Sequence, residues 1–204
     1  RCDLRSAYCM PEEDYTGLPK EGILTFDEIL RLVDAFVSRG VRRVRLTGGE
    51  PLLRSGLVDL IRDLARRSGV EDLALTTNAT RLARWAGPLR DAGLKRITVS
   101  LDSLKPGRFE TLTRRAALDD VLKGIRAASE VGFDELKLNT VVMQDFNDDE
   151  LIDLVDFATD HGAQARFIEY MDVGGATLWS AERVVTREDI LTRLAAHFGP
   201  VTPE

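Results

Sequence analysis

The chain has 204 residues, of which 44% are hydrophobic and 30% are charged. We expect one domain, residues 1–204, because this length and composition suit a globular core and exclude a disordered or fibrous chain. A formal net charge of -6 argues against nucleic acid as a partner, and no apolar run approaches the roughly 18 residues that span a membrane. With two cysteines the chain is no disulfide scaffold, and we expect a reducing, cytoplasmic location.

Runs of helical periodicity recur along the chain. The first helix is expected to follow Thr25, with Glu28 as the reciprocal residue of a capping box, and to stop at Gly40. No strand precedes this helix, which predicts an opening strand upstream of Arg1. Further helices are expected at Gly56–Ser68, Arg81–Ala92, Asp119–Val131, Asp148–His161 and Arg187–His197.

Short runs rich in β-branched residues lie between these helices. They predict strands at Val41–Thr47, Asp72–Thr77, Arg96–Leu101, Glu135–Val142 and Ala165–Tyr170. Each pair of successive strands is separated by enough chain for a helix and two loops, as strand-helix-strand units require. The sequence therefore predicts an α/β fold with a parallel sheet.

Polar residues gather where these strands end. In parallel α/β folds ligands bind at the carboxyl ends of the strands, where the loops converge. The residues concerned are Gly48-Gly49-Glu50-Pro51, Thr76-Thr77-Asn78, Ser100-Leu101-Asp102 and Glu169-Tyr170-Met171. Each of these runs is also a sequence that is common in ordinary turns, but their joint position favours a binding site.

Three basic residues fall on one face of the predicted strands. Strand alternation places Arg45, Lys137 and Arg166 on the face that helices do not cover, so we expect them to point inward. Two readings are open. The cations pair with nearby carboxylates as a structural network, or they bind a polyanion such as a nucleotide phosphate chain.

Cys2 and Cys9 stand near the start of the chain with Ser6 between them. A cysteine at position 6 would complete a Cys-x3-Cys-x2-Cys loop, which supplies three thiolates to a four-iron cluster. With serine there the pattern is incomplete, and two cysteines alone are more often two thiols than a metal site.

Several runs taken together resemble one family. The segment from Cys2 to Cys9 with Tyr8, the Gly-Gly-Glu-Pro run, and the runs at 76–78, 100–103, 137–139 and 166–171 resemble the radical S-adenosylmethionine (SAM) enzymes. Within them they resemble the GTP cyclases that begin molybdenum cofactor synthesis. The resemblance extends along essentially the whole chain. It implies a partial (β/α)6 TIM-type barrel of parallel strands whose first strand is missing here.

The resemblance also implies site residues. Cys2 and Cys9 would be ligands of a 4Fe-4S cluster. Residues near SAM would be Tyr8, Gly48, Gly49, Glu50, Ser100, Asn139 and Met171. Residues in contact with GTP would be Arg45, Thr76 and Lys137, in agreement with the inward cations inferred from strand alternation.

The chemistry that the resemblance implies needs no acid-base pair. The reduced cluster cleaves SAM, and the resulting 5′-deoxyadenosyl radical takes a hydrogen from the ribose of GTP, which then closes onto the guanine to give a 3′,8-cyclo nucleotide. This reaction would be a lyase step. The partners that the resemblance allows are GTP, a second copy of the chain in a homodimer, and the pterin synthase that acts next.

The sequence departs from the family at Ser6. A serine hydroxyl is less acidic than a thiol, and its hard oxygen is a poorer iron ligand, so we expect a lost or labile cluster and an inactive chain. The family's opening strand, with an arginine for GTP, and its C-terminal part, with three cysteines and a Gly-Gly tail, are also missing. Asn78-Ala79 replaces the family's usual Asn-Gly, which we expect to matter little.

Other readings stay open. One is a different radical SAM enzyme, such as one that modifies peptides, which would have no use for Arg45 and Lys137. A second is a nucleotide-binding or partner-binding homologue without a cluster, which Ser6 favours. A third is a phosphate-handling barrel lyase, which leaves the segment from Cys2 to Cys9 unexplained.

Overall fold

The computed structural model describes residues 1–10, 19, 22–172 and 179–202. The chain divides into two compact units. The first comprises Arg1–Asp3, Asp14–Val99 and Asp120–Leu136, and the second Leu4–Glu13, Ser100–Asp119 and Lys137–Glu204. In the described residues no helix combines the length and apolar character that crossing a membrane would require.

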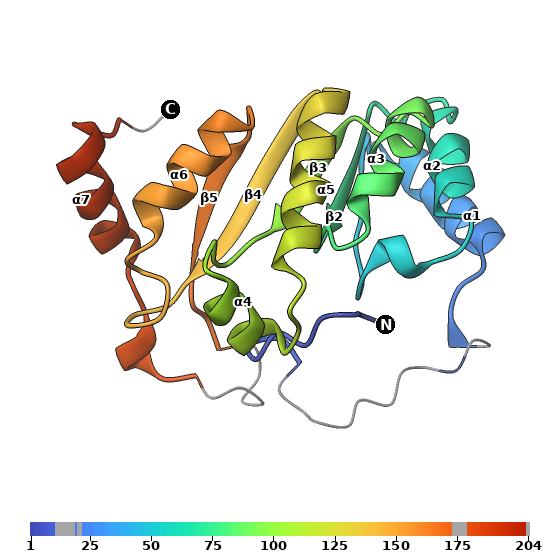
Figure 1. Ribbon diagram of the computed structural model, residues 1–204. Coiled ribbons are helices and arrows are strands. Elements are labelled where there is room, and N and C mark those ends of the chain that lie inside the picture. Colours follow the sequence, from blue (N-terminus) through green and yellow to red (C-terminus); the bar gives the residue numbers. More distant parts are fainter. Residues whose placement is uncertain (11–18, 20–21, 173–178, 203–204) are drawn as a thin grey trace. The chain divides into compact units, whose positions relative to one another are not determined.

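The first unit is built on three parallel strands (Figure 1). These are β1 (Arg43–Leu46), β2 (Asp72–Thr77) and β3 (Arg96–Ser100), with β2 in the middle. The helices are α1 (Phe26–Val37), α2 (Leu57–Ala65), α3 (Leu82–Asp91) and α5 (Leu118–Val131), and a short 3-10 helix spans Pro51–Leu53. The register aligns Leu46 with Leu75 and Leu75 with Ile97, so one face of these strands is apolar, buried at Leu75 and Ile97 and half-buried at Leu46.

The second unit is built on one parallel pair, β4 (Glu135–Val142) with β5 (Gln164–Glu169). Its helices are α4 (Pro106–Thr113), α6 (Leu151–Asp160) and α7 (Arg187–Phe198), with a 3-10 helix at Ala181–Arg183. Helix α6 packs on β5, and α7 packs on both. Their core comprises Val142, Leu151, Val185, Ile190, Phe167 and Leu194. The expected α/β class with parallel strands is confirmed.

Most predicted elements are present, and two were placed correctly to the residue, β2 and β4. The capping box of α1 is confirmed, with Glu28 N donating to Thr25 Oγ1 over 3.3 Å and Thr25 N to Glu28 Oε2 over 2.7 Å. Strand β1 is shorter than predicted at both ends, and β5 lies one residue earlier than predicted.

The helices differ from the predictions in three places, of which the first is that α2 ends at Ala65 rather than at Ser68. Helix α4 was not predicted, although Pro106 occupies its first turn and Phe109 and Leu112 are buried. Helix α6 begins three residues later than predicted, because Asn147 and Glu150 turn their side chains toward other segments before the helix starts. Asn147 Nδ2 donates to Asp102 O over 2.7 Å, and Glu150 accepts from Ser103.

One glycine sets the distance between α5 and the loop after β2. A Cβ on Gly124 would lie 2.5 Å from Ala79 O and 3.0 Å from Leu82 Cβ, closer than packed atoms allow. We expect Gly124→Ala to lower the free energy of unfolding by about 1–3 kcal/mol, although alanine is the better helix former. Urea denaturation measures this.

Gly87 in α3 is the matched control, because a Cβ there would meet nothing within 4 Å. Gly87→Ala should be neutral or stabilise the chain by up to about 1 kcal/mol. Equal effects of the two substitutions would contradict the close approach.

Candidate functional site

The turn after β1 lies against the first residue of the chain. Glu50 N donates to Arg1 O over 2.7 Å, and a Cβ on Gly49 would lie 2.1 Å from that same oxygen. Only glycine permits this approach of two backbones. Gly48 adopts a φ of +154°, which side chains rarely allow. The Gly-Gly pair thus brings the segment that carries Cys2 against β1.

Glu50 joins this turn to the end of β2. Its Oε1 accepts from Leu52 N over 2.9 Å and from Thr77 Oγ1 over 2.7 Å, and its Oε2 accepts from Asn78 N over 2.8 Å. The residue is 5% exposed, and burial raises the pKa of its carboxyl while these donors oppose the rise. Glu50 therefore holds two strand ends of the predicted site together.

Asp3 anchors the residue that follows the first cysteine. It accepts from Asn78 Nδ2 over 2.7 Å and from Thr80 Oγ1 over 3.0 Å, and it pairs with Arg81 at 3.4 Å. Burial raises the pKa of this carboxyl, but the hydrogen bonds from Asn78 and Thr80 outweigh burial and leave the pKa below its usual value. Sequence reasoning missed Asp3, and the polar run after β2 was the available signal.

Ala79 lies in the left-handed region with a φ of 60°, in the middle of the Asn78–Thr80 turn. A side chain costs about 1 kcal/mol or more there, which glycine avoids. The departure from Asn-Gly noted in the sequence therefore leaves a strained residue beside the anchor of Asp3.

Arg45 reaches across the polar face of the first unit. Its Nη1 donates to Thr76 Oγ1 over 3.0 Å and to Thr98 Oγ1 over 3.1 Å. Two residues expected to contact GTP, Arg45 and Thr76, thus lie together, and Thr98 joins them without having been predicted. Arg45 is exposed rather than buried, because threonine hydroxyls and solvent surround it in place of a carboxylate.

In the second unit Tyr8 binds a buried acid. Its hydroxyl donates to Asp102 Oδ2 over 2.8 Å, and Val141 N donates to Asp102 Oδ1 over 2.8 Å. Burial raises the pKa of Asp102 to about 6 against the opposing effect of these donors. Burial, then the charge of Asp102, raises the pKa of the Tyr8 phenol well above its usual value. In the sequence, Asp102 was noted as part of a strand end.

The remaining predicted residues of the second unit differ in exposure. Lys137 is 7% exposed, Met171 is 61% exposed, and Ser100 is half-buried. Asn139 pairs in register with Arg166, so the two share a face of β4 and β5. The Oδ1 atom of Asn139 is buried and accepts no hydrogen bond from the described residues. A buried acceptor of this kind suits a ligand that brings a donor.

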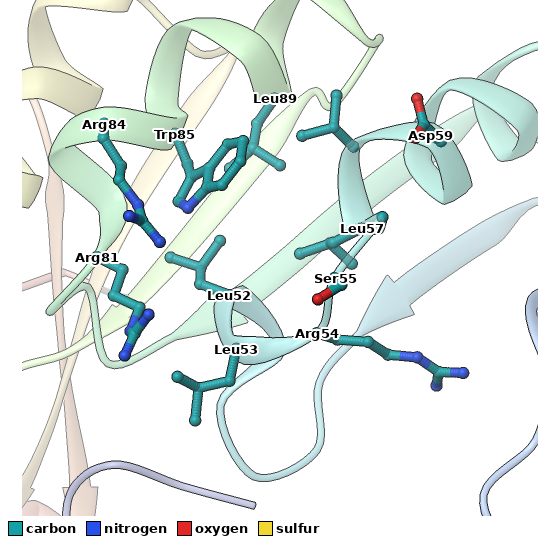
Figure 2. Close-up of a pocket in the computed structure, with 12 residues that line it drawn as sticks. Leu52, Leu53, Arg54, Ser55, Leu57, Asp59, Arg81, Arg84, Trp85 and Leu89 are labelled. Carbon is teal, nitrogen blue, oxygen red and sulfur yellow. The ribbon is translucent and has the colours of Figure 1, made fainter. Parts of the chain in front are cut away.

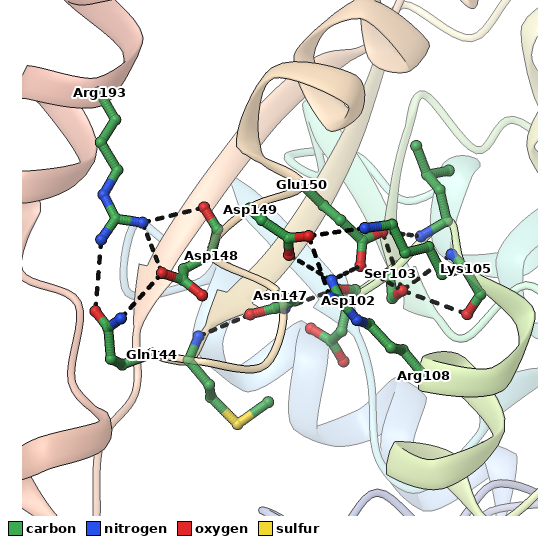
Figure 3. A network of polar contacts seen from close by, with 12 residues as sticks. Asp102, Ser103, Lys105, Arg108, Gln144, Asn147, Asp148, Asp149, Glu150 and Arg193 are labelled. Carbon is green, nitrogen blue, oxygen red and sulfur yellow. Dashed lines mark hydrogen bonds and ion pairs between the residues drawn. The ribbon is translucent and has the colours of Figure 1, made fainter.

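A network of charged side chains fixes the loop that carries Asp102 (Figure 3). Glu150 is fully buried and accepts from Ser103 Oγ over 2.8 Å, from Leu104 N over 2.8 Å and from Arg108 Nη1 over 2.8 Å. Asn147 adds its hydrogen bond to Asp102 O. The Ser-Leu-Asp-Ser run is therefore held from several sides by residues that sequence reasoning did not single out.

The segment around Ser6 offers fewer thiolates than an iron-sulfur cluster needs. The backbone oxygen of Ser6 accepts from Cys9 N over 3.0 Å and from Met10 N over 2.8 Å, which forms a turn. Cys9 is exposed and Cys2 is half-buried. No group of three or more histidine, cysteine or acidic side chains able to hold a metal occurs within residues 1–10, 19, 22–172 and 179–202. Two thiols and a hydroxyl do not fit a cluster that needs three thiolates.

The raised pKa of Asp102 makes stability depend on pH. Its folded pKa of about 6 exceeds the usual 3.8, so the folded chain binds the proton more tightly than the unfolded chain does. The contribution of Asp102 to the free energy of unfolding should therefore increase by about 1 kcal/mol as the pH falls from 7 to 5. Urea denaturation at both pH values measures this gain.

Asp102→Asn is the control, because an amide keeps the shape and does not titrate. The gain should be absent in the variant, once the change common to both proteins is subtracted. A gain of the same size in Asp102→Asn would contradict the assignment to this carboxyl.

The chain matches the radical SAM superfamily over residues 1–158. Among curated proteins it is 48% identical over 205 residues to GTP 3′,8-cyclase 3 of Mycobacterium tuberculosis, covering 98% of this chain and 54% of that protein. It is 50% identical over 208 residues to GTP 3′,8-cyclase of Acidothermus cellulolyticus, covering 100% of this chain and 57% of that protein. The chain thus spans little more than half the length of these relatives.

Solved structures share its fold at low sequence identity. Methylornithine synthase superposes with a TM-score of 0.73 and 14% identity, over 97% of this chain and 59% of that one. Streptococcus suis SuiB bound to S-adenosylmethionine gives a TM-score of 0.70 and 22% identity, over 88% of this chain and 40% of that one. The family match over most of the sequence and this shared fold agree, and the chain belongs to the radical SAM superfamily.

Proposed function

We propose that residues 1–204 form one radical SAM core, derived from a GTP 3′,8-cyclase that converts GTP to a 3′,8-cyclo nucleotide at the start of molybdenum cofactor synthesis. The curated relatives with 48% and 50% identity carry the name of this activity, a lyase reaction. The observation that carries the proposal is the contact of Arg45 with Thr76. It brings together two side chains assigned to GTP from separate strands.

The geometry around Arg45 suits a phosphate chain. Its described contacts use Nη1 alone, and the side chain is exposed, so further N–H donors remain for phosphate oxygens. In the second unit, taken by itself, Lys137 lies on β4 with 7% exposure and is the other cation that we assign to GTP. An arginine fork and a lysine point charge are the usual protein partners of phosphate.

The proposed SAM contacts come from each unit separately. In the first unit the Gly48-Gly49 turn offers backbone unobstructed by side chains, and Glu50 is already aligned by Leu52, Thr77 and Asn78. In the second unit Asn139 offers a buried acceptor without a donor, and Ser100, Tyr8 and Met171 complete the proposed set.

The cofactors of the superfamily are SAM and a 4Fe-4S cluster, but the donors of this chain do not fit the cluster. Cys2 and Cys9 are retained, while Ser6 presents a hydroxyl where the loop needs a thiolate. We infer that the chain binds SAM and GTP but holds no stable cluster, and no SAM cleavage is expected from it as it stands.

A second candidate follows from the same serine. A homologue that keeps the nucleotide site and has lost the cluster would act as a nucleotide-binding or partner-binding protein. This candidate shares GTP binding with the first, and the two differ in whether cysteine at position 6 restores chemistry. Dimer formation, hand-over to a pterin synthase and a cytoplasmic location stay predictions.

The iron content tests the role of position 6. Anaerobic reconstitution of the chain with iron and sulfide should leave it well below four irons per chain, while Ser6→Cys should reach about four with a cluster spectrum. Ser38→Cys is the control, because this exposed serine at the end of α1 adds a thiol away from the segment of Cys2 and Cys9.

Two outcomes would count against the proposal. A chain with serine that holds about four irons would contradict the claim about Ser6. Failure of Ser6→Cys in the full-length protein to cleave SAM with a reductant would favour the nucleotide-binding homologue.

Binding of GTP tests the nucleotide site independently of the cluster. We expect Arg45→Met to weaken GTP binding about tenfold or more, the loss typical of one charge-assisted hydrogen bond. Arg43→Met is the matched control, since Arg43 lies two residues earlier on the same face of β1. Equilibrium dialysis with labelled GTP measures both, and equal losses would show that charge alone, not the position of Arg45, matters.

A further inference from the structure

A cavity of about 410 Å³ lies in the first unit, apart from the residues assigned to SAM or GTP. The 3-10 helix at Pro51–Leu53, the start of α2 and helix α3 line it (Figure 2). Its apolar lining comprises Leu52, Leu53, Leu57, Val58, Leu89 and the ring of Trp85. The cavity is of the size that takes a small organic molecule.

The indole nitrogen of Trp85 is buried and donates to no acceptor among the described residues. Indole N–H is a donor only, and burying it without an acceptor costs free energy. Trp179 shows the usual arrangement, since its Nε1 donates to Tyr170 O over 3.1 Å. The nitrogen of Trp85 lies on the side of the ring that faces Leu52 and Arg84 (Figure 2). A buried donor without a partner among the described residues therefore lies in a residue that lines the cavity.

Among the charged residues that line the cavity, Arg84 is the cation beside this donor. Arg84 lies over the ring of Trp85 at 5.1 Å, and no ion pair of Arg84 occurs in the part of the chain that the structure describes. Arg81 is neutralised by Asp3 at 3.4 Å. The other two charged residues of the lining are Asp59, which pairs with Arg62, and Arg54, which points away from Trp85 toward the ring of Phe26 (Figure 2).

We propose that this cavity binds a small monocarboxylic acid with an apolar body. The carboxylate accepts hydrogen bonds from Trp85 Nε1 and from the Arg84 guanidinium, and the apolar body packs against the leucines. A single negative charge matches the single cation left unpaired beside the donor, whereas a dianionic phosphate would be under-neutralised.

This site is independent of the proposed function, because none of its lining residues is assigned to SAM, GTP or the cluster. It adjoins that machinery through two contacts. Leu52 donates its backbone N–H to Glu50, and Arg81 pairs with Asp3 next to Cys2.

Calorimetric titration of the full-length protein with 3-phenylpropionate tests the proposal, with 3-phenylpropionamide as the neutral analogue of equal shape. The acid should bind at least about tenfold more tightly than the amide, since a charge-assisted hydrogen bond is at stake. Trp85→Phe, which keeps the ring and removes the donor, and Arg84→Gln should each weaken the acid about tenfold or more. Trp179→Phe should leave binding unchanged.

A second readout follows the donor itself. The indole N–H resonance of Trp85, identified by its loss in Trp85→Phe, should shift on addition of the acid and not of the amide. No heat and no shift with the acid, equal binding of acid and amide, or unaltered binding in both Trp85→Phe and Arg84→Gln would each overturn the proposal.

Discussion

The buried carboxylate of Glu50 is the interaction on which the first unit's site depends. It accepts one hydrogen bond from a backbone N–H of the turn after β1, and two from a hydroxyl and a backbone N–H at the end of β2. Each of these donors would cost about 1–3 kcal/mol if left buried and unpaired, so the three together make any other placement of the turn expensive. The same residue's N–H holds Arg1, which positions the cysteine-bearing segment.

The second unit is also held together by buried carboxylates, but their surroundings differ. Asp102 and Glu150 are buried acids satisfied mainly by N–H and O–H donors, and Glu150 alone also meets an arginine. Asp102 has no cation among its described partners, so burial prevails and the pKa of Asp102 rises. Asp3 is half-buried, and its hydrogen-bond donors lower the pKa of its carboxyl. The depth of burial and the kind of donor thus decide the direction of the pKa shifts of Asp102 and Asp3.

The sequence was informative wherever local patterns carry the structure. The capping box of α1 and the strands β2 and β4 follow from periodicity and cap residues within a few positions of each other. Helix α4 was missed because its apolar face is narrow, and α6 starts late because Asn147 and Glu150 serve distant segments. A local pattern contains no sign of such distant contacts.

In the site, too, some residues could be predicted from local sequence motifs and others could not. Residues that resemble a family motif could be named in advance, and the contact of Arg45 with Thr76 agrees with that naming. The residues that position them could not be named, because the side chains of Asp3, Thr98 and Glu150 act through partners 42 to 78 positions away. Even the exposure of Arg45 depended on which groups surround it in three dimensions rather than on strand alternation.

Ser6 illustrates how chemistry can change while the scaffold does not. The turn around it is held by its backbone oxygen, which accepts from Cys9 N and Met10 N whatever side chain the position carries. Asp3 and Glu50 fix the preceding segment through contacts that do not involve Ser6. The side chain at position 6 is not part of these backbone contacts, although the Ser6 hydroxyl hydrogen-bonds the Tyr8 phenol. A thiol and a hydroxyl are very different ligands for a metal. It follows that loss of a cluster ligand would leave the proposed nucleotide contacts intact, and that their presence alone says nothing of redox activity.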